Sequence, residues 1–220
     1  MKVMFIIPSM AGGGAERVIS VLANAFTEKG IETKIMMTAG NACDYRLHSD
    51  VKLLQAGEVT GGSVLKRFAR ILAMRRLFKA NRDSILMAFE PDAAFFTGIA
   101  KVGLSMKLLA SERNDPKSFG SSKVRKFAYH WADKLVFQTG DAMEFFSSDI
   151  QAKGCIVPNP ISEALPEPYI GQRKKTVVAV SRLEPQTNHK MMLQAFARFV
   201  KQYPEYTLHL YGKGSLEDEL

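Results

Sequence analysis

Short apolar runs alternate with longer segments of helical periodicity along the 220-residue chain. The first run, 3–7, is rich in strand-forming residues, and the next segment carries apolar residues three and four positions apart. The predicted apolar face of this first helix comprises Val18, Val21, Leu22, Ala25 and Phe26. Further strands are predicted at 33–37, 51–54, 85–89, 107–110, 135–137, 155–157, 176–180 and 206–211. Strand–helix alternation of this kind indicates an α/β protein with parallel sheets and right-handed crossovers.

The alternation is interrupted once and then starts again. Pro158, Pro160, Pro166 and Pro168 fall in a stretch with little apolar periodicity, which is typical of an ordered linker. We therefore predict two Rossmann-like, doubly wound domains, 1–160 and 174–220, joined by a linker at 161–173. Within the second, helices are predicted at 191–203 and from Leu216 onward.

Three consecutive glycines, Gly12, Gly13 and Gly14, separate the first strand from the first helix. Glycines allow backbone conformations that a Cβ would forbid and let a ligand approach bare peptide amides. The start of the helix adds unpaired N–H groups and the positive end of its dipole. The loop therefore favours an anion, above all a phosphate. A tight turn without a ligand is the alternative, because the spacing is that of neither G-x-G-x-x-G nor a P-loop.

A second polar cluster, Ser111-Glu112-Arg113-Asn114-Asp115-Pro116, directly follows the strand at 107–110. Ligands of open α/β sheets bind at the carboxyl ends of the strands, so this cluster is a candidate site. A helix cap and turn is the alternative. His130 has no His or Cys partner nearby in the sequence, so we expect it to pack or cap rather than to bind a metal.

Positive charge is in excess: 30 Lys and Arg face 22 Asp and Glu, for a net charge of +8 and a pI of about 9.5. Such a balance favours an anionic partner, namely nucleic acid, a phosphorylated small molecule or acidic lipid. The predicted helix 63–82 concentrates this charge without an intervening acid. Its basic residues are Lys66, Arg67, Arg70, Arg75, Arg76, Lys79 and Arg82, and Leu65, Phe68, Ile71, Leu72 and Phe78 are assigned to one apolar side. The pattern predicts contact with an anionic membrane surface or an acceptor phosphate; a packed helix with a solvated basic face is the alternative.

The remaining composition narrows the class of protein. Cys43 and Cys155 make no disulfide framework, and no Cys/His cluster has metal-binding spacing. No apolar run approaches the length of about 18 residues that a membrane span needs, and no signal peptide is evident. We therefore expect a cytoplasmic protein, with peripheral attachment to the inner face of a membrane as an option.

Four motifs in order along the chain carry a family resemblance. They are Gly12-Gly13-Gly14-Ala15-Glu16-Arg17, Ser111 to Pro116, Val157-Pro158-Asn159-Pro160-Ile161, and Val180 to Gln186 together with Leu210 to Leu216. In this set the chain resembles the retaining glycosyltransferases of GT-B fold, in the large family 4-like group that includes lipopolysaccharide, O-antigen and capsule sugar transferases. The matches extend over nearly the whole chain.

The resemblance implies a division of labour between the two domains. The first would bind the acceptor and the second a UDP- or GDP-linked sugar, with transfer in the cleft, retention of anomeric configuration and neither cofactor nor metal. Without a metal, protein cations and amides must stabilise the charge of the departing diphosphate. Arg182 matches the family arginine that contacts the diphosphate, and Lys190 is a weaker second cation. The other implied site residues are Gly12, Gly13, Gly14, Gly212 and Gly214 for the donor phosphates, and Glu16, Arg17, Glu112, Arg113 and Asn114 on the acceptor side.

Three departures from the family pattern stand out. Thr187 occupies the position of a lysine usually found about five residues after the arginine, and Arg113 occupies the place where many relatives carry a histidine. The second domain is also short of the family's length and lacks its paired glutamates. We therefore expect a complete first domain with the first part of a second, and a 220-residue chain that is inactive when isolated.

The leading hypothesis is thus a hexosyltransferase-type enzyme, or a fragment of one, that transfers a sugar to a lipid-linked or polysaccharide acceptor in cell-surface glycan synthesis. The alternative is a non-catalytic relative that binds acceptor or anionic lipid, or acts as a scaffold. Nucleic-acid binding would rest on net charge alone, because no fold signature for it is present, and it is not expected.

Overall fold

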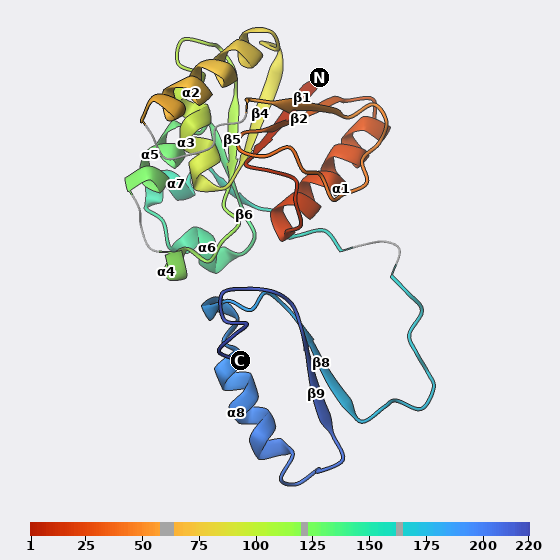
Figure 1. The fold of residues 1–220 in the computed structure, drawn as a ribbon. Coiled ribbons are helices and arrows are strands. Elements are labelled where there is room, and N and C mark those ends of the chain that lie inside the picture. The colour runs from red at the N-terminus through yellow and green to blue at the C-terminus, as the bar shows by residue number, and fades with distance from the viewer. Residues whose placement is uncertain (58–63, 120–122, 162–164) are drawn as a thin grey trace. The chain divides into compact units, whose positions relative to one another are not determined.

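The computed structural model describes residues 1–57, 64–119, 123–161 and 165–220. The chain divides into two compact units, Met1–Ser162 and Glu163–Leu220, and each is described by itself (Figure 1). Residues 165–175, most of the predicted linker, are exposed and form neither helix nor strand. The predicted start of the helix 63–82 lies outside the described residues.

The first unit is built on a seven-stranded, fully parallel sheet of order β3-β2-β1-β4-β5-β6-β7. Its strands are β1 (Lys2–Ile7), β2 (Glu32–Met37), β3 (Lys52–Gln55), β4 (Ser84–Phe89), β5 (Leu108–Ser111), β6 (Lys134–Phe137) and β7 (Gly154–Ile156). Each begins within one or two residues of its predicted position, because buried parallel strands read as nearly continuous apolar runs.

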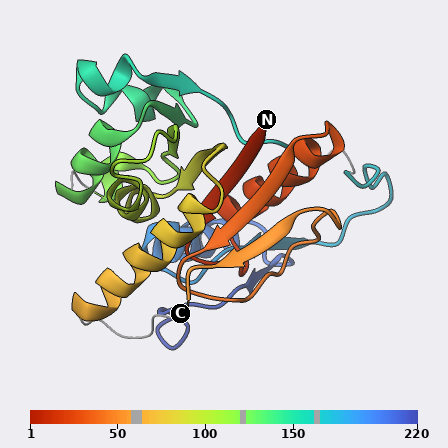
Figure 2. The ribbon, with the colours of Figure 1, turned by 90° about the horizontal axis from the view of Figure 1, so that it is seen from above.

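Helices cover both faces of this sheet. Its helices are α1 (Gly14–Glu28), α2 (Val64–Lys79), α3 (Pro91–Ala100), α4 (Pro116–Phe119), α5 (Lys123–Trp131), α6 (Gly140–Glu144) and α7 (Ser148–Gln151). Val3, Phe5 and Ile7 of β1 pack on the side of α1, whereas Met4 and Ile6 face the core shared with α2, α3 and α5. Figures 1 and 2 show α1 on one side of the sheet and these three helices on the other. The predicted doubly wound arrangement is confirmed for this unit.

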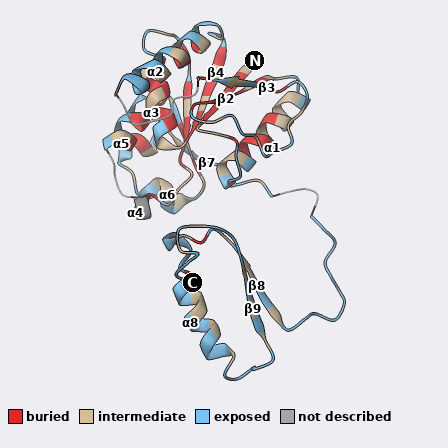
Figure 3. Cartoon of the chain, in the orientation of Figure 1, coloured by how far each residue is buried: buried red, intermediate tan, exposed pale blue. Residues whose placement is uncertain are grey.

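Two predicted helix faces are wrong in detail. In α1, Ile19 and Ala23 are fully buried while Val21 is 38% exposed, so the buried stripe is rotated by about one residue from the predicted one. In α2 the apolar residues do not share one side: Met74 and Phe78 are buried (Figure 3). Leu65, Phe68 and Leu72 are 80%, 60% and 58% exposed. At about 100° per residue, these two stripes lie roughly 120° apart.

The second unit pairs β8 (Thr176–Val180) in parallel with β9 (Thr207–Tyr211), connected through the short 3₁₀ helix η1 (Pro185–Thr187) and α8 (His189–Phe199). The predicted helix 191–203 ends early at Phe199, since Pro204 disfavours helical backbone in the residue before it. The helix predicted from Leu216 is absent; residues 215–219 form turns, in which the amide of Glu219 donates to the carbonyl of Leu216. In the described part of this unit only Leu183 and His189 are buried.

Among the described helices, none combines the length and the apolar character needed to cross a bilayer.

Candidate functional site

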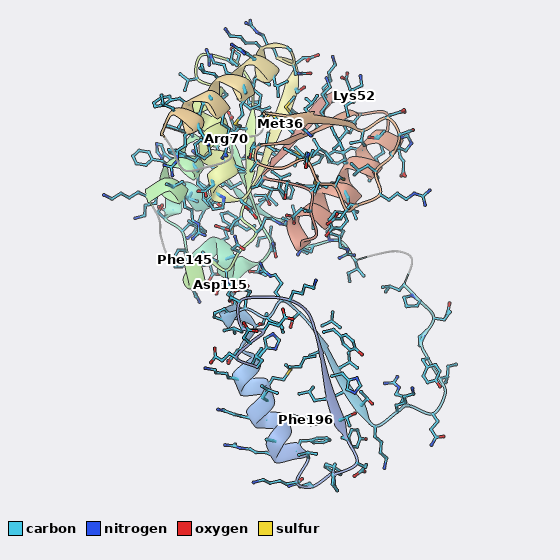
Figure 4. The ribbon with its side chains drawn as sticks, viewed as in Figure 1. Met36, Lys52, Arg70, Asp115, Phe145 and Phe196 are labelled. Atoms are coloured by element: carbon cyan, nitrogen blue, oxygen red, sulfur yellow. The ribbon has the colours of Figure 1, made fainter. Side chains whose placement is uncertain are left out.

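The carboxyl ends of the parallel strands bring the predicted motifs of the first unit to one edge. The glycine loop follows β1, Glu90 follows β4, and Glu112 to Asn114 follow β5. Gln138 follows β6, and Asn159 lies shortly after β7. Asp115, labelled in Figure 4, marks this edge of the sheet. Because strand polarity alone collects these residues, the site needs no long insertion.

The glycine loop is held by a neighbouring segment that the sequence analysis did not connect with it. The amide of Gly12 donates to Oδ2 of Asp44 at 2.8 Å, and the amide of Gly13 donates to Oη of Tyr45 at 2.8 Å. A β-bridge between Met10 and Cys43 aligns the two segments. The expectation of bare amides is therefore wrong for Gly12 and Gly13, because side chains occupy them.

The Gly14 amide differs, since no described group accepts a hydrogen bond from it. It begins α1, so an anion there would also meet the helix dipole. Glu16 folds back over the loop: a Cβ on Gly13 would overlap its carboxylate. Arg17 is exposed on the first turn of α1. The phosphate-binding role of the loop stays a prediction, now centred on Gly14.

Glu112 lies beneath the loop after β5 rather than on its surface. Its side chain is 1% exposed, and its Oε2 pairs with Nε of Arg125 at 3.1 Å and accepts from Oη of Tyr129 at 2.9 Å. Its Oε1 accepts the amides of Arg113 and Asn114, both at 3.1 Å. A carboxylate with this set of donors positions the loop, so its predicted contact with the acceptor is replaced by a supporting role.

Arg113 and Asn114, by contrast, lie half-buried at the edge. The Arg113 guanidinium lies over the ring of Phe89, 5.3 Å from its centroid, and Nη2 donates to Oδ1 of Asn159. Asn159 Nδ2 donates to Oε1 of Gln138 at 3.3 Å, and Gln138 Nε2 donates to the carbonyl oxygen of Arg113 at 3.2 Å. Three loops are thereby tied into one ring of hydrogen bonds, and burial lowers the pKa of Arg113.

A pocket of roughly 420 Å³ opens beside this ring. Its lining residues are Glu112, Arg113, Asn114, Asp115, Pro116, Lys117, Gln138, Thr139, Asp141 and Ala142. The volume of this pocket and its mixture of polar and apolar lining residues are typical of a site for a small molecule. A larger pocket of roughly 620 Å³ lies between α5 and the α6–α7 segment, with the aromatic walls Phe127, Phe145 and Phe146, and carries none of the predicted site residues.

Glu90 has the most unusual backbone at this edge. Its φ of 78° and ψ of 149° fall in a region that is essentially restricted to glycine, which costs of order 1–3 kcal/mol. Burial raises the pKa of its carboxyl, and the nearby charges of Glu16, Asp92 and Glu112 raise it further. Strain of this kind is often kept at functional sites, and the sequence analysis did not select Glu90.

In the second unit, Arg182 follows β8 and its side chain is exposed. Its carbonyl accepts Oγ1 of Thr187 at 2.8 Å and the ring Nε2 of buried His189 at 3.0 Å. Thr187, at the position of the expected lysine, therefore shapes the loop that presents Arg182 and supplies no charge. Lys190 forms an ion pair with Glu219 at 2.5 Å, which reduces the positive charge it would offer a phosphate.

The two glycines after β9 are explained by close packing of loops. A Cβ on Gly212 would overlap the carbonyl oxygen of Ser181, and one on Gly214 would overlap that of Leu183. Glu184 adds to the junction, because its carboxylate accepts the amide and hydroxyl of Ser215 at 3.1 and 2.9 Å. These bonds and the charge of Arg182 lower the pKa of Glu184. The structure thus gives both glycines a packing role, and their contact with a donor phosphate stays a prediction.

Several residues of these arrangements had no signal in the sequence. Asp44 and Tyr45 lie in a polar segment without periodicity, Gln138 directly follows β6, and His189 is the first residue of α8. Asn159, Glu184 and Ser215, by contrast, lay in motifs that we had selected. In the described parts of the chain, His, Cys, Asp and Glu do not gather in a group of three that could hold a metal ion; metal independence stays a prediction.

Comparisons with known proteins agree with this geometry, although no family model matches the chain. The chain is 26% identical over 230 residues to an α-1,4-N-acetyl-D-galactosaminyltransferase of Campylobacter jejuni, covering 100% of this chain and 64% of that enzyme. The named acceptor of the Campylobacter enzyme is GalNAc-α-(1→4)-GalNAc-α-(1→3)-diNAcBac-PP-undecaprenol. This chain therefore spans somewhat less than two thirds of the length of that relative.

Solved structures share the fold at lower identity. Anabaena HepE in complex with UDP and glucose superposes with a TM-score of 0.75 at 16% identity, covering 100% of this chain and 63% of HepE. The UDP-GlcNAc 2-epimerase of Methanocaldococcus jannaschii gives 0.61 at 13% identity, covering 96% of this chain and 65% of the epimerase. The predicted GT-B fold class is confirmed. More particularly, the curated relatives of this chain are glycosyltransferases, whereas the fold by itself is shared with epimerases.

Proposed function

We propose that the chain provides the acceptor-binding unit and the opening of the donor-binding unit of a retaining glycosyltransferase. The donor would be a UDP- or GDP-linked hexose, and the acceptor a lipid-linked or polysaccharide glycan. The observation that carries the proposal is the match of the whole chain to an enzyme whose named acceptor is a glycan on a diphosphate-linked undecaprenol. The polar edge of the first unit and the exposed Arg182 loop of the second supply residues suited to this chemistry.

The chemical task is to stabilise the negative charge that grows on the leaving diphosphate. Arg182 is exposed at the carboxyl end of β8 and forms no ion pair with any described carboxylate, so its charge is available to a diphosphate. The amide of Gly14, at the start of α1, is a second group suited to a phosphate oxygen. Neither a metal ion nor another cofactor enters the proposal, and nucleic acid is not expected as a partner.

The exposed side of α2 supports a peripheral location on the cytoplasmic face of the inner membrane. Leu65, Phe68 and Leu72 form an exposed apolar stripe on a helix that also carries Lys66, Arg67 and Arg76. This combination is typical of helices that lie in the interface of acidic membranes. Replacing the three apolar residues by serine should abolish cosedimentation with phosphatidylglycerol vesicles, whereas Val21→Ser on α1 should not.

Transfer from a panel of UDP- and GDP-linked sugars to polyprenyl-diphosphate glycans tests the function. The assay uses the 220-residue chain and the chain extended to the length of its relatives. Arg182→Gln should lower kcat roughly 100-fold or more, while Arg198→Gln, an exposed arginine at the end of α8, should leave it unchanged. NMR of the anomeric proton in the product tests retention. If no donor supports transfer or hydrolysis in either form, the proposal is wrong.

A non-catalytic binding or scaffold protein is the second candidate, favoured by two contacts in the second unit. The hydroxyl of Thr187 donates to the carbonyls of Arg182 and Glu184, whereas a lysine at this position would supply a positive charge. Lys190 is paired with Glu219. Both reduce the positive field around a diphosphate. Calorimetry separates the candidates: nucleotide binding of about millimolar affinity or weaker, with full binding to anionic vesicles, supports this second one.

A further inference from the structure

The guanidinium of Arg113 is held in place but left with donors to spare. A guanidinium has five N–H donors, and among the described side chains the one acceptor bonded to that of Arg113 is Oδ1 of Asn159. Its Nε is buried and has no hydrogen-bond partner within the described part of the chain. Phe89 covers one face of the group and leaves its edge open to other contacts. The ring through Asn159 and Gln138 fixes the orientation of this edge.

The charge of Arg113 also has no carboxylate partner among the residues that the structure describes. Among the described residues, no carboxylate lies within the 4 Å of an ion pair with it, and Glu112 next to it in sequence is turned inward to Arg125. Asp115 and Asp141 line the same pocket, but Asp115 accepts the amide of Lys117 and neither is paired with Arg113. Burial lowers the pKa of Arg113, which reflects the cost of a half-buried cation. Buried charges in proteins are normally paired.

Arg125 provides an internal comparison. It lies on α5 at 4% exposure and pairs with the equally buried Glu112 at 3.1 Å. The same fold thus pairs one arginine of this edge with a buried acid and leaves the other facing a pocket of roughly 420 Å³. A rigid, half-desolvated guanidinium with free donors is well suited to bidentate binding of an oxyanion.

We propose that Arg113 binds an oxyanion, a phosphate or a carboxylate, carried by the acceptor, in the pocket at the carboxyl ends of β5 and β6. This inference rests on the proposed function for the identity of the ligand as acceptor, since the donor diphosphate is assigned there to Arg182 and the amide of Gly14. It makes Arg113 a residue that selects acidic acceptors over neutral ones. A histidine at this position would be largely neutral at pH 7 and would lack the planar fork.

Binding is tested directly on the 220-residue chain by NMR of ¹⁵N-labelled arginine side chains. The Arg113 Nε–H signal is assigned as the one missing in Arg113→Lys. Pyrophosphate and methyl glucuronide are the two probes, and they distinguish a phosphate from a carboxylate as the source of the anion. We expect saturable movement of this signal with at least one probe at about millimolar concentration. Arg113→Gln should weaken that probe roughly 10- to 100-fold.

Two controls separate this role from a structural one. Lys134→Gln removes an exposed cation at the amino-terminal end of β6, away from the pocket, and should change the affinity less than threefold, that is, by less than about 0.7 kcal/mol. Arg113→Gln should keep or raise the melting temperature, because it removes an unpaired half-buried charge. A signal that both probes leave unmoved up to about 50 mM, or an equal loss of affinity in Lys134→Gln, overturns the proposal. A marked fall in melting temperature for Arg113→Gln does so as well.

The outcome is distinguishable from failure of the proposed function. If Arg113 binds a probe and yet no donor supports transfer, the oxyanion site stands and the transferase assignment falls. If transfer occurs, we expect kcat/KM for an acidic acceptor to fall at least tenfold in Arg113→Gln and kcat/KM for a neutral one to stay constant. Equal effects on both acceptors overturn the selectivity proposed here.

Discussion

Replacing Glu112 by glutamine is the sharpest test of the network under the candidate acceptor site. The change preserves shape but removes the charge that pairs with Arg125, at side-chain exposures of 1% and 5%. Removing one member of a buried ion pair typically costs about 3–5 kcal/mol, because the other charge stays buried and unpaired. The glutamine oxygen can still accept some of the bonds from Tyr129 and the loop amides, so we expect the lower end, about 3 kcal/mol.

Urea unfolding followed by tryptophan fluorescence measures this loss in the first unit alone. Trp131 is the single tryptophan of the chain and lies on α5, stacked on Phe95 at 6.1 Å between ring centroids. With a slope of about 2 kcal/mol per molar urea, a loss of about 3 kcal/mol lowers the midpoint by roughly 1.5 M. As a matched control, Asp149→Asn removes an exposed carboxylate near His130 and should change the stability by less than about 0.5 kcal/mol.

A double-mutant cycle locates the cause. If the penalty comes from stranding Arg125, the double variant Glu112→Gln/Arg125→Met should be more stable than the sum of the single losses predicts, by about 1 kcal/mol or more. A loss below about 1 kcal/mol in Glu112→Gln, or additive losses in the cycle, would refute the reasoning that this pair organises the loop.

Three further predictions concern the same two units. Glu90→Gln should raise the melting temperature at pH 7 by roughly 1–3 °C and change it little at pH 4. Because the pKa of Glu90 is raised on folding, the stability that its carboxyl contributes is complete below the ordinary pKa of 4.5 and is lost as pH rises through the folded pKa. An equal difference in melting temperature between variant and parent at the two pH values contradicts this. Burial and Glu112 raise the pKa of Tyr129 well above 10.0, so the stability of the protein should fall as pH rises beyond 10. Tyr129→Phe should make that fall shallower and should cost about 1.5–3 kcal/mol at pH 7. Thermal melts from pH 7 to 11 check both expectations, and parallel curves for the two proteins would count against them. Gly214→Ala should disrupt the second unit, because its Cβ would overlap the Leu183 carbonyl, and should leave the unfolding transition followed by Trp131 fluorescence unchanged. Far-UV circular dichroism and limited proteolysis check this, and a native second unit would contradict it.

The positions of the strands, and of the motifs that follow them, could be predicted from the sequence for a simple physical reason. Buried parallel strands are apolar on both faces, so their runs are visible without knowledge of partners. Strand polarity then fixes which loops meet, which is why the 111–116 motif could be predicted to lie at the ligand-binding edge of the sheet. The helix faces were harder to predict, because α2 carries two apolar stripes of which one is exposed.

Side-chain bonding between loops could not be predicted. Glu112 reads as an exposed acid after a strand, and only tertiary structure shows that Arg125 and Tyr129 lie beneath it. The pairing of Asp44 and Tyr45 with the glycine amides depends on a β-bridge between segments about thirty residues apart. From the sequence, Thr187 only marked the absence of a lysine, whereas the structure shows that its hydroxyl donates to the carbonyls of Arg182 and Glu184.

The hydrogen-bond ring of Arg113, Asn159 and Gln138 has a consequence for protein engineering. A chimera that takes only the segment after β5 from a relative would replace Arg113 and leave Asn159 and Gln138, whose positions suit hydrogen bonds to Arg113, unchanged. The segments after β6 and β7 would have to be transplanted with it. In the acceptor-binding role that we propose, acceptor preference would be transferred only by the three loops together, and single-loop grafts should yield folded proteins with disordered recognition surfaces.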